Sequence, residues 1–336
     1  MRKIAVKGLN WIGDAVMSSP FFKSLKNGIP DSEITVIARS STAEVYKCNP
    51  YIDKVIEINE KKNFFSAVSQ LKKYEFDEGI LLPKSLTSAL FFYLSGIKKL
   101  SGFKTQYRGL ILKNKIELSN DILQKHQVHL YLELAEKCGG NELSEIKLIF
   151  ETSDEIDFSV EKKWLPQNKK YIGINHGAAF GPAKKWLPEY FAKVINHFAG
   201  CYNFTPVIFG SANERDTADE IIRRISGNIE IVDLCGKMNI RELFSCIKKC
   251  SLFITNDSGP MHIAAALNIP TTAIFGSTNH IKTGPFSGNS TSVYLNMPCA
   301  PCIKRNCRFG TYQCMLDIKP EKVIDAAEKL LKSNVL

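Results

Sequence analysis

Long apolar runs are missing from this sequence of 336 residues. The nearest approach to one, Ala89-Leu-Phe-Phe-Tyr-Leu94, ends at Ser95-Gly96 and is far shorter than the roughly 18 to 20 apolar residues that a membrane-spanning helix requires. The N-terminal residues include Arg2 and Lys3 but lack the apolar core and the small-residue cleavage site of a secretory signal. We therefore expect a soluble, cytoplasmic protein.

The loop after the first predicted strand lacks the glycine pattern of a dinucleotide-binding site. Residues 3–7 are followed by Gly8-Leu-Asn-Trp-Ile-Gly-Asp14, whereas the dinucleotide fingerprint would read Gly-x-Gly-x-x-Gly. This difference counts against an enzyme with a nicotinamide cofactor. Asp14, at a helix start, would most often be a helix cap. As a functional residue it would be placed to remove a proton from an acceptor, across a cleft from a diphosphate site.

Acidic residues are outnumbered, since 34 Asp and Glu stand against 44 Lys and Arg, for a formal net charge of +10. Nucleic acid, an acidic lipid surface or a phosphorylated substrate would each fit this excess. One basic stretch is interleaved with Phe103 and Tyr107: Lys98, Lys99, Lys104, Arg108, Lys113 and Lys115. No nucleic-acid-binding motif accompanies it, so we expect no nucleic-acid partner. We interpret it as a surface for a substrate with phosphates or carboxylates at a membrane face, with a solvated charged face as the alternative.

Short apolar runs alternate with amphipathic stretches, which is typical of parallel sheets covered by helices. The length fits two domains, and the alternation weakens between Glu151 and Lys170, where charges and Pro166 indicate a linker. The sequence therefore predicts two doubly wound α/β halves with a cleft between them. We predict an N-terminal domain over 1–155, a linker over 156–168, a C-terminal domain over 169–316 and a final helix over 317–336.

Two strand–loop–helix junctions in the C-terminal half carry small and polar residues. The first, His176-Gly-Ala-Ala-Phe-Gly-Pro-Ala-Lys-Lys-Trp-Leu-Pro-Glu189, contains glycines that let a ligand approach the backbone, and the lysine pair Lys184 and Lys185. The second, Thr255-Asn-Asp-Ser-Gly-Pro-Met-His262, offers Asp257 and Ser258 as helix caps. Either loop alone could be an ordinary connection. Because the carboxyl ends of parallel strands meet at one edge of a sheet, the pair predicts a nucleotide-diphosphate site.

Six of the ten cysteines are scattered, as expected of reduced thiols in a protein core. The other four form the cluster Cys299-x-x-Cys302-x4-Cys307-x6-Cys314. This spacing could ligate zinc or an iron–sulfur centre, could form disulfides in an exported protein, or could belong to a loop with incidental thiols. We give a structural metal or a redox-sensitive staple the same weight as incidental thiols.

The chain carries five motifs in a fixed order: Trp11-Ile-Gly-Asp14, Leu82-Pro-Lys-Ser85 with Ser88-Ala-Leu90, Gly177-Ala-Ala-Phe-Gly-Pro-Ala-Lys-Lys-Trp186, Phe209-Gly-Ser211, and Asn256-Asp-Ser-Gly259 with His262. Together they resemble the ADP-heptose:lipopolysaccharide heptosyltransferases, most of all the type II enzymes, over nearly the whole chain. The resemblance implies a glycosyltransferase-B fold, in which two Rossmann-like halves hold the active site between them. It also implies that the final helix packs back on the N-terminal half.

The resemblance further implies roles for individual residues. It makes Asp14 the general base on the acceptor hydroxyl, and Lys184 the cation that stabilises the departing diphosphate. Glu214 would hold the ribose, the backbone of Met238 would read the adenine, and the full donor-binding set would be Gly177, Lys184, Glu214, Met238, Asp257, Ser258, Gly259 and His262. The anionic acceptor would be bound by Lys61, Lys62, Lys98, Lys99, Lys104 and Arg108.

The implied activity is an inverting transfer of heptose from ADP-L-glycero-D-manno-heptose onto the Kdo-containing inner core of lipopolysaccharide, with no metal required for catalysis. The enzyme would then work as a peripheral protein at the cytoplasmic face of the inner membrane. Three alternatives stay open: a related glycosyltransferase with another nucleotide sugar, a sugar-nucleotide epimerase, and a non-catalytic nucleotide-sugar binder.

Overall fold

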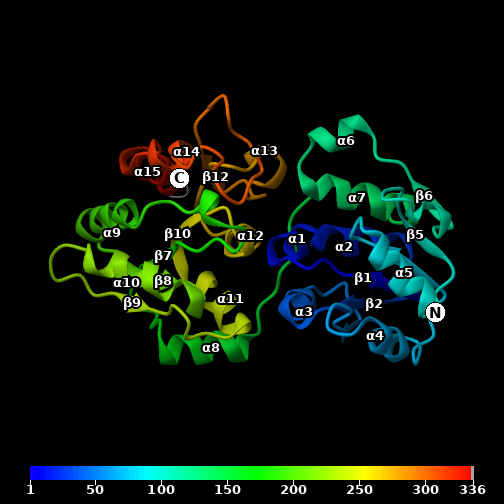
Figure 1. Cartoon of the computed structure of the whole chain (residues 1–336). Coiled ribbons are helices and arrows are strands. Elements are labelled where there is room, and N and C mark those ends of the chain that lie inside the picture. The colour runs from blue at the N-terminus through cyan, green and yellow to red at the C-terminus, as the bar shows by residue number, and fades with distance from the viewer. Residues whose placement is uncertain (334–336) are drawn as a thin grey trace. The chain divides into compact units, whose positions relative to one another are not determined.

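The structure, a computed structural model, describes residues 1–333, and the chain forms two compact units, Met1–Glu151 and a second unit that begins at Thr152 (Figure 1). Each unit is built on one six-stranded parallel sheet, which confirms the predicted α/β class. The segment predicted as a linker, 156–168, contains most of helix α8 (Asp154–Lys163), which packs against α11 (Ile240–Lys248) of the second unit. An ion pair supports this packing, because Asp157 Oδ2 lies 2.6 Å from Lys248 Nζ.

The first sheet has the spatial strand order β3-β2-β1-β4-β5-β6. The middle of the central strand β1 is apolar because both faces of the sheet are covered, and its Ile4, Ala5 and Val6 are fully buried. The direction of the strand order reverses between β1 and β4, so these two strands form the switch point of the sheet. The strands are β1 (Arg2–Lys7), β2 (Ser32–Ala38), β3 (Lys54–Glu57), β4 (Glu78–Leu81), β5 (Leu100–Phe103) and β6 (Asn114–Ile116).

Helices cover both faces of this first sheet. α2 and α7 pack against each other on one face, while α4 and α5 bury Val68, Leu71 and Phe91 against the other (Figure 1). The helices are α1 (Ile12–Met17), α2 (Ser19–Gly28), α3 (Ser40–Lys47), α4 (Phe64–Leu71), α5 (Leu86–Leu94), α6 (Asn120–Gln124) and α7 (Gln127–Lys137), and a 3-10 turn, η1, covers Arg108–Leu110.

The second sheet has the order β12-β11-β10-β7-β8-β9, which repeats the first when it is followed from β9. Its switch point therefore lies between β7 and β10. The strands are β7 (Tyr171–Asn175), β8 (Thr205–Phe209), β9 (Val232–Asp233), β10 (Cys250–Asn256), β11 (Thr271–Ile274) and β12 (Ser290–Val293).

One face of the second sheet is covered by α9, α10 and α15, whose side chains share a core with Trp186. The remaining helices are α9 (Pro188–Tyr202), α10 (Arg215–Arg223), α12 (Gly259–Ala266), α13 (His280–Thr283), α14 (Gln313–Leu316) and α15 (Pro320–Ser333), with 3-10 turns η2 (Pro182–Lys184) and η3 (Ala212–Glu214). α15 buries Val323 and Ala327 in this core, and its packing against the first unit stays a prediction. Residues 334–336 of the predicted final helix lie outside the described residues. Every helix within residues 1–333 is too short or too polar to span a bilayer.

Candidate active site

Every donor-binding residue expected from the sequence lies at the carboxyl edge of the second sheet. Gly177 and Lys184 follow β7, Glu214 follows β8, and Met238 follows β9. The fourth loop, after β10, contributes Asp257, Ser258, Gly259 and His262, of which the last lies buried on α12. The structure therefore brings all eight residues to one edge of one sheet, although their roles in binding stay predictions.

An ion pair joins the two loops at the switch point of this sheet. Lys184 Nζ lies 2.5 Å from Asp257 Oδ2, and the Thr278 hydroxyl donates a hydrogen bond of 2.5 Å to the same oxygen. The Lys184 side chain is only 13% exposed, and its ammonium lies 4.8 Å from the centre of the Phe180 ring. Because Asp257 neutralises this ammonium, an incoming diphosphate would have to replace the carboxylate as the partner of Lys184.

Gly177 and Glu214 are in direct contact, although they follow different strands. A Cβ atom at position 177 would collide with Glu214 Oε1, so any larger side chain there would displace the Glu214 carboxylate. The other oxygen, Glu214 Oε2, accepts hydrogen bonds of 2.8 Å from the backbone N–H and the hydroxyl of Ser211, and so completes a capping box. Glu214 is thus held rigidly at the mouth of the β7 loop, where it could also accept hydrogen bonds from ribose hydroxyls.

Two asparagines that the sequence did not indicate as functional connect these loops. Asn256 accepts a hydrogen bond of 3.1 Å from the backbone N–H of Trp186 and donates one of 2.7 Å to the His176 carbonyl. Asn175 donates to the Ser258 hydroxyl at 2.9 Å. These bonds fix the β7 loop to the β10 loop on both sides of the Lys184–Asp257 pair. Asn256 stands in the recognised Asn-Asp-Ser-Gly motif, so its motif position was the available signal.

His176, the first residue of the β7 loop, is only 1% exposed. Burial lowers its pKa to about 4, and the positive charges of Lys185 and Arg215 contribute to the shift, while Glu214 opposes it. The imidazole is therefore neutral at physiological pH. His176 therefore adds no positive charge to this edge of the sheet.

The cysteine-rich segment supports the same loops. The backbone N–H of Ala183 donates to the Arg305 carbonyl at 3.1 Å, and that of Ile303 donates to the Ser277 carbonyl at 2.7 Å. Gly181 has a φ of +150°, and a Cβ atom there would lie 2.8 Å from the Arg305 carbonyl oxygen. Segment 299–314 thus holds both the Lys184 loop and the loop that carries Thr278.

The predicted metal site at the four cysteines is not supported. All ten cysteines are free thiols. The four do share one region, since nearness to the other three raises the pKa of the Cys314 thiol, after the larger effect of burial. Within residues 1–333, however, no three His, Cys, Asp or Glu side chains are arranged to hold a metal ion. The Cys307 thiol instead interacts with the backbone N–H groups of Tyr312, Phe309 and Thr311, which lower its pKa.

The carboxyl edge of the first sheet carries Asp14 at the switch point. The N-cap of α1 is Trp11, and Asp14 lies in the first turn, so Asp14 is not the helix cap that its position suggested. Its charge raises the pKa of two tyrosines, Tyr46 and Tyr131, after the larger effect of their burial. Asp14 is therefore a half-buried carboxylate close to two buried hydroxyl groups.

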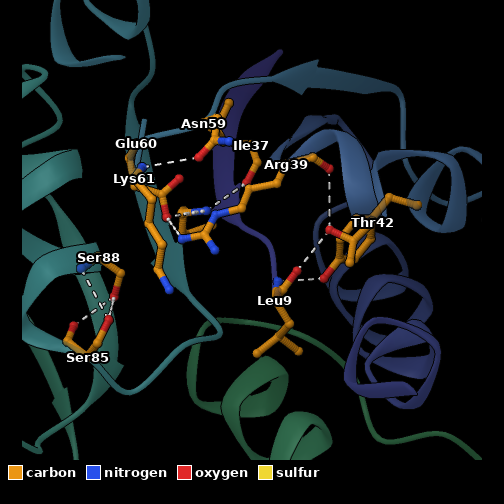
Figure 2. Close-up of polar contacts among 11 residues, drawn as sticks. Leu9, Ile37, Arg39, Thr42, Asn59, Glu60, Lys61, Ser85 and Ser88 are labelled. Carbon is orange, nitrogen blue, oxygen red and sulfur yellow. Dashed lines mark hydrogen bonds and ion pairs between the residues drawn. The ribbon is translucent and has the colours of Figure 1, made fainter. Parts of the chain in front are cut away.

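A buried ion cluster fixes the neighbouring loop, which follows β3. Glu60 Oε1 lies 2.6 Å from Arg39 Nη2 (Figure 2). The same oxygen lies 3.6 Å from Lys7 Nζ. Burial alone would raise the pKa of Glu60, but Arg39 and Lys7 hold it below its usual value. For the Lys7 ammonium, burial has the opposite effect and lowers the pKa. Lys61 and Lys62 follow at once and are exposed, and Figure 2 shows the Lys61 ammonium pointing away from the Arg39–Glu60 pair.

The other predicted acceptor-binding residues do not form one surface cluster. Lys98 and Lys99 precede β5 and lie at the amino edge of the sheet, whereas Lys104 follows β5 at the carboxyl edge, with Lys61 and Lys62. Arg108 is fully buried, so its prediction as a surface contact needs correction. Its guanidinium donates to the Phe103 carbonyl at 2.7 Å and to the Pro83 carbonyl at 2.5 Å. Arg108 therefore holds two loops together instead of facing solvent.

The sequence profile of glycosyltransferase family 9 (heptosyltransferase) matches residues 64–313. This chain belongs to that family. It is 34% identical to the lipooligosaccharide heptosyltransferase 2 of Campylobacter jejuni, with 99% of this chain and 100% of that protein covered. It is 26% identical to the lipopolysaccharide heptosyltransferase 2 of Escherichia coli, with 98% of each covered.

Solved structures agree with this assignment. The ADP-heptose lipopolysaccharide heptosyltransferase II of Escherichia coli matches with a TM-score of 0.84 and 25% identity, over 99% of this chain and 100% of that one. A family 9 glycosyl transferase of Veillonella parvula matches with a TM-score of 0.87 and 25% identity, over 99% and 98%. The predicted glycosyltransferase activity and the glycosyltransferase-B architecture are thereby confirmed.

Proposed function

We propose that this heptosyltransferase-family enzyme moves heptose from ADP-L-glycero-D-manno-heptose onto the Kdo-containing inner core of lipopolysaccharide. Two of its relatives are named heptosyltransferase 2. A similar solved structure is named ADP-heptose lipopolysaccharide heptosyltransferase II. The observation that carries the proposal is the Lys184–Asp257 pair at the switch point of the second sheet. A half-buried ammonium between two glycine-bearing loops fits a diphosphate group.

The second unit would bind the donor and stabilise its leaving group. As the acceptor attacks the anomeric carbon, negative charge grows on the departing diphosphate, and Lys184 would exchange Asp257 for this charge. Glu214 would accept hydrogen bonds from the ribose, and the backbone near Met238 would contact the adenine. Gly177 would let the nucleotide approach the backbone beside Glu214.

The first unit would activate the acceptor. Asp14 takes the proton of the acceptor hydroxyl as that oxygen attacks, and a single displacement inverts the anomeric configuration. Lys61, Lys62 and Lys104, at the same edge of the sheet as Asp14, would meet the acceptor's carboxylates and phosphates. Because this acceptor is anchored by a lipid, the enzyme would act as a peripheral protein at a membrane surface.

Incubation of the purified enzyme with ADP-heptose, with and without a Kdo-lipid acceptor, tests the proposal. We expect ADP release and a heptose-sized mass increase of the acceptor only when both substrates are present. An epimerase would change the donor without acceptor, and a binding protein would change neither substrate. Transfer from a different nucleotide sugar, with none from ADP-heptose, would also contradict the proposal.

A further inference from the structure

A long segment of the first unit carries positive charge only. Between Glu78 and Glu117 the sequence contains seven Lys and Arg residues and no Asp or Glu. Arg108 is buried, but the six lysines are exposed or half-buried: Lys84, Lys98, Lys99, Lys104, Lys113 and Lys115. This segment covers the β4–β5–β6 end of the sheet, where β6 is the edge strand. An excess of one sign of charge attracts an anionic partner.

Two large apolar side chains project from the loop that connects β5 to β6 within this segment. Tyr107 is 92% exposed and Leu110 is 94% exposed, more than any other large apolar side chain among the described residues. Tyr107 is the N-cap of the 3-10 turn η1, and Leu110 is the last residue of that turn. A lone exposed apolar residue is ordinary, but two in one short loop, which also contains Lys104 and Lys113, form a small apolar projection.

The loop is held in a strained conformation, so this exposure is built into the fold. Gln106 and Tyr107 both adopt positive φ values, 49° and 61°, which non-glycine residues seldom do. The buried Arg108 guanidinium binds the carbonyls of Phe103 and Pro83, and Thr105 Oγ1 donates to the Lys84 carbonyl at 2.7 Å. The loop is thus fixed to the loop after β4, at the switch point of the sheet.

Burial lowers the pKa of Arg108 to about 10, which leaves its guanidinium charged at neutral pH. A buried cation bound to backbone carbonyls serves to hold the chain in place, since it is shielded from ligands by the loops that it joins. Tyr107 and Leu110 are therefore presented to solvent by a rigid support.

We propose that the 104–113 loop is a membrane-contact element, in which Tyr107 and Leu110 enter the headgroup region of an anionic bilayer and Lys113 and Lys115 lie near lipid phosphates. This inference rests on the proposed function, because a lipid-anchored acceptor brings the enzyme to a bilayer. The charge complementarity and the small apolar area favour lipid. A stable protein partner would typically require a patch of about 800 Å² on each side. Through Arg108 and Thr105, the docked loop would hold the loop after β4 at the lipid surface.

Cosedimentation of the full chain with vesicles of phosphatidylglycerol and phosphatidylethanolamine, without any acceptor, tests this proposal. The double variant Tyr107→Ser/Leu110→Ser should partition into the vesicles at least about tenfold more weakly than the wild type, because two apolar anchors are lost. Its transfer to a deacylated, water-soluble acceptor should stay unchanged. Phe158→Ser is the matched control, since Phe158 is 69% exposed on α8 of the second unit, and this variant should bind vesicles normally.

A second variant tests the charges. Lys113→Gln/Lys115→Gln should weaken binding to anionic vesicles and leave the weak binding to pure phosphatidylcholine unchanged. Unaltered vesicle binding by both double variants would overturn the proposal. So would a wild-type dimer that Leu110→Ser dissociates, because the projection would then join two copies of the chain. If the wild type fails to modify even the deacylated acceptor, the proposed function fails, whereas the vesicle result still decides the role of the loop.

Discussion

The two sheets share one strand order, yet their switch points carry different chemistry. In the second unit, two glycine-bearing loops enclose a cation, Lys184, whose ammonium pairs with Asp257. In the first unit the corresponding position holds a carboxylate, Asp14, in the first turn of α1. Because the strand order is the same, the difference lies in the loops, which determine what each unit does. We therefore propose that one unit receives negative charge and the other receives a proton.

The two edges are also stabilised differently. In the second unit, neutral groups hold the loops in place. Hydrogen bonds of Asn175 and Asn256 connect the β7 loop, which carries Gly177 and Lys184, to the β10 loop. At the edge of the first sheet, the Arg39–Glu60–Lys7 cluster fixes the loop that presents Lys61 and Lys62. The edge of the first sheet therefore carries an excess of positive charge, as an anionic acceptor would require.

The largest expected effect comes from removing the carboxylate of the first switch point. Asp14→Asn should lower turnover by roughly two to four orders of magnitude, because no general base would remain on the acceptor hydroxyl. Steady-state kinetics with ADP-heptose and a Kdo-lipid acceptor measure this. Asp121→Asn, at an exposed carboxylate that pairs with Lys125, serves as control and should keep normal turnover. Turnover near the wild-type value in Asp14→Asn would remove Asp14 from the chemistry.

Removal of the cation at the switch point of the second sheet should have the next largest effect on turnover. Lys184→Ala should lower turnover by about one to two orders of magnitude and weaken ADP binding, because the leaving diphosphate loses its positive partner. Lys185→Ala is the matched control, since Asp257 pairs with Lys184. The same kinetic assay, with ADP as product inhibitor, compares the two. Equal losses in both variants would mean that the loop acts through its total charge.

Substitution of Gly177, which lies against Glu214, should have a smaller effect that is confined to donor binding. Gly177→Ala should weaken ADP binding by about tenfold, because the new methyl group displaces the Glu214 carboxylate. Gly200→Ala provides the control, as a Cβ atom there meets nothing within 4 Å. Fluorescence or calorimetric titration with ADP measures both. Unchanged ADP affinity in Gly177→Ala would separate Glu214 from the donor site.

The smallest effect is expected for the acceptor lysines. Lys61→Gln/Lys62→Gln should raise the apparent acceptor KM several-fold at low salt and flatten its salt dependence, because screening acts on exposed charges. Lys98→Gln/Lys99→Gln removes the same charge from the opposite edge of the sheet and should change KM less. A larger rise in the second pair would assign the acceptor to the amino edge, and a change in donor affinity would reverse the roles of the two units.

Local patterns were sufficient to predict the sheets and the shared edge of the two glycine-bearing loops. Lys184 and Asp257 stand next to predicted strands, and the carboxyl ends of parallel strands must meet, so their shared edge follows from sequence. The direction of a side chain does not follow in the same way. Arg108 stands in a basic stretch but turns inward to two carbonyl groups, and Lys98 and Lys99 are separated from Lys104 by the whole length of β5. Cysteine spacing likewise could not reveal that the Cys307 thiol interacts with backbone N–H groups.

Calorimetric titration of Asp14→Asn and Lys184→Ala with ADP tests the division of roles most directly. This division of roles predicts that Asp14→Asn binds ADP as tightly as the wild type while its turnover collapses, and that Lys184→Ala binds ADP at least about tenfold more weakly. Loss of ADP binding in Asp14→Asn, with normal binding in Lys184→Ala, would contradict it.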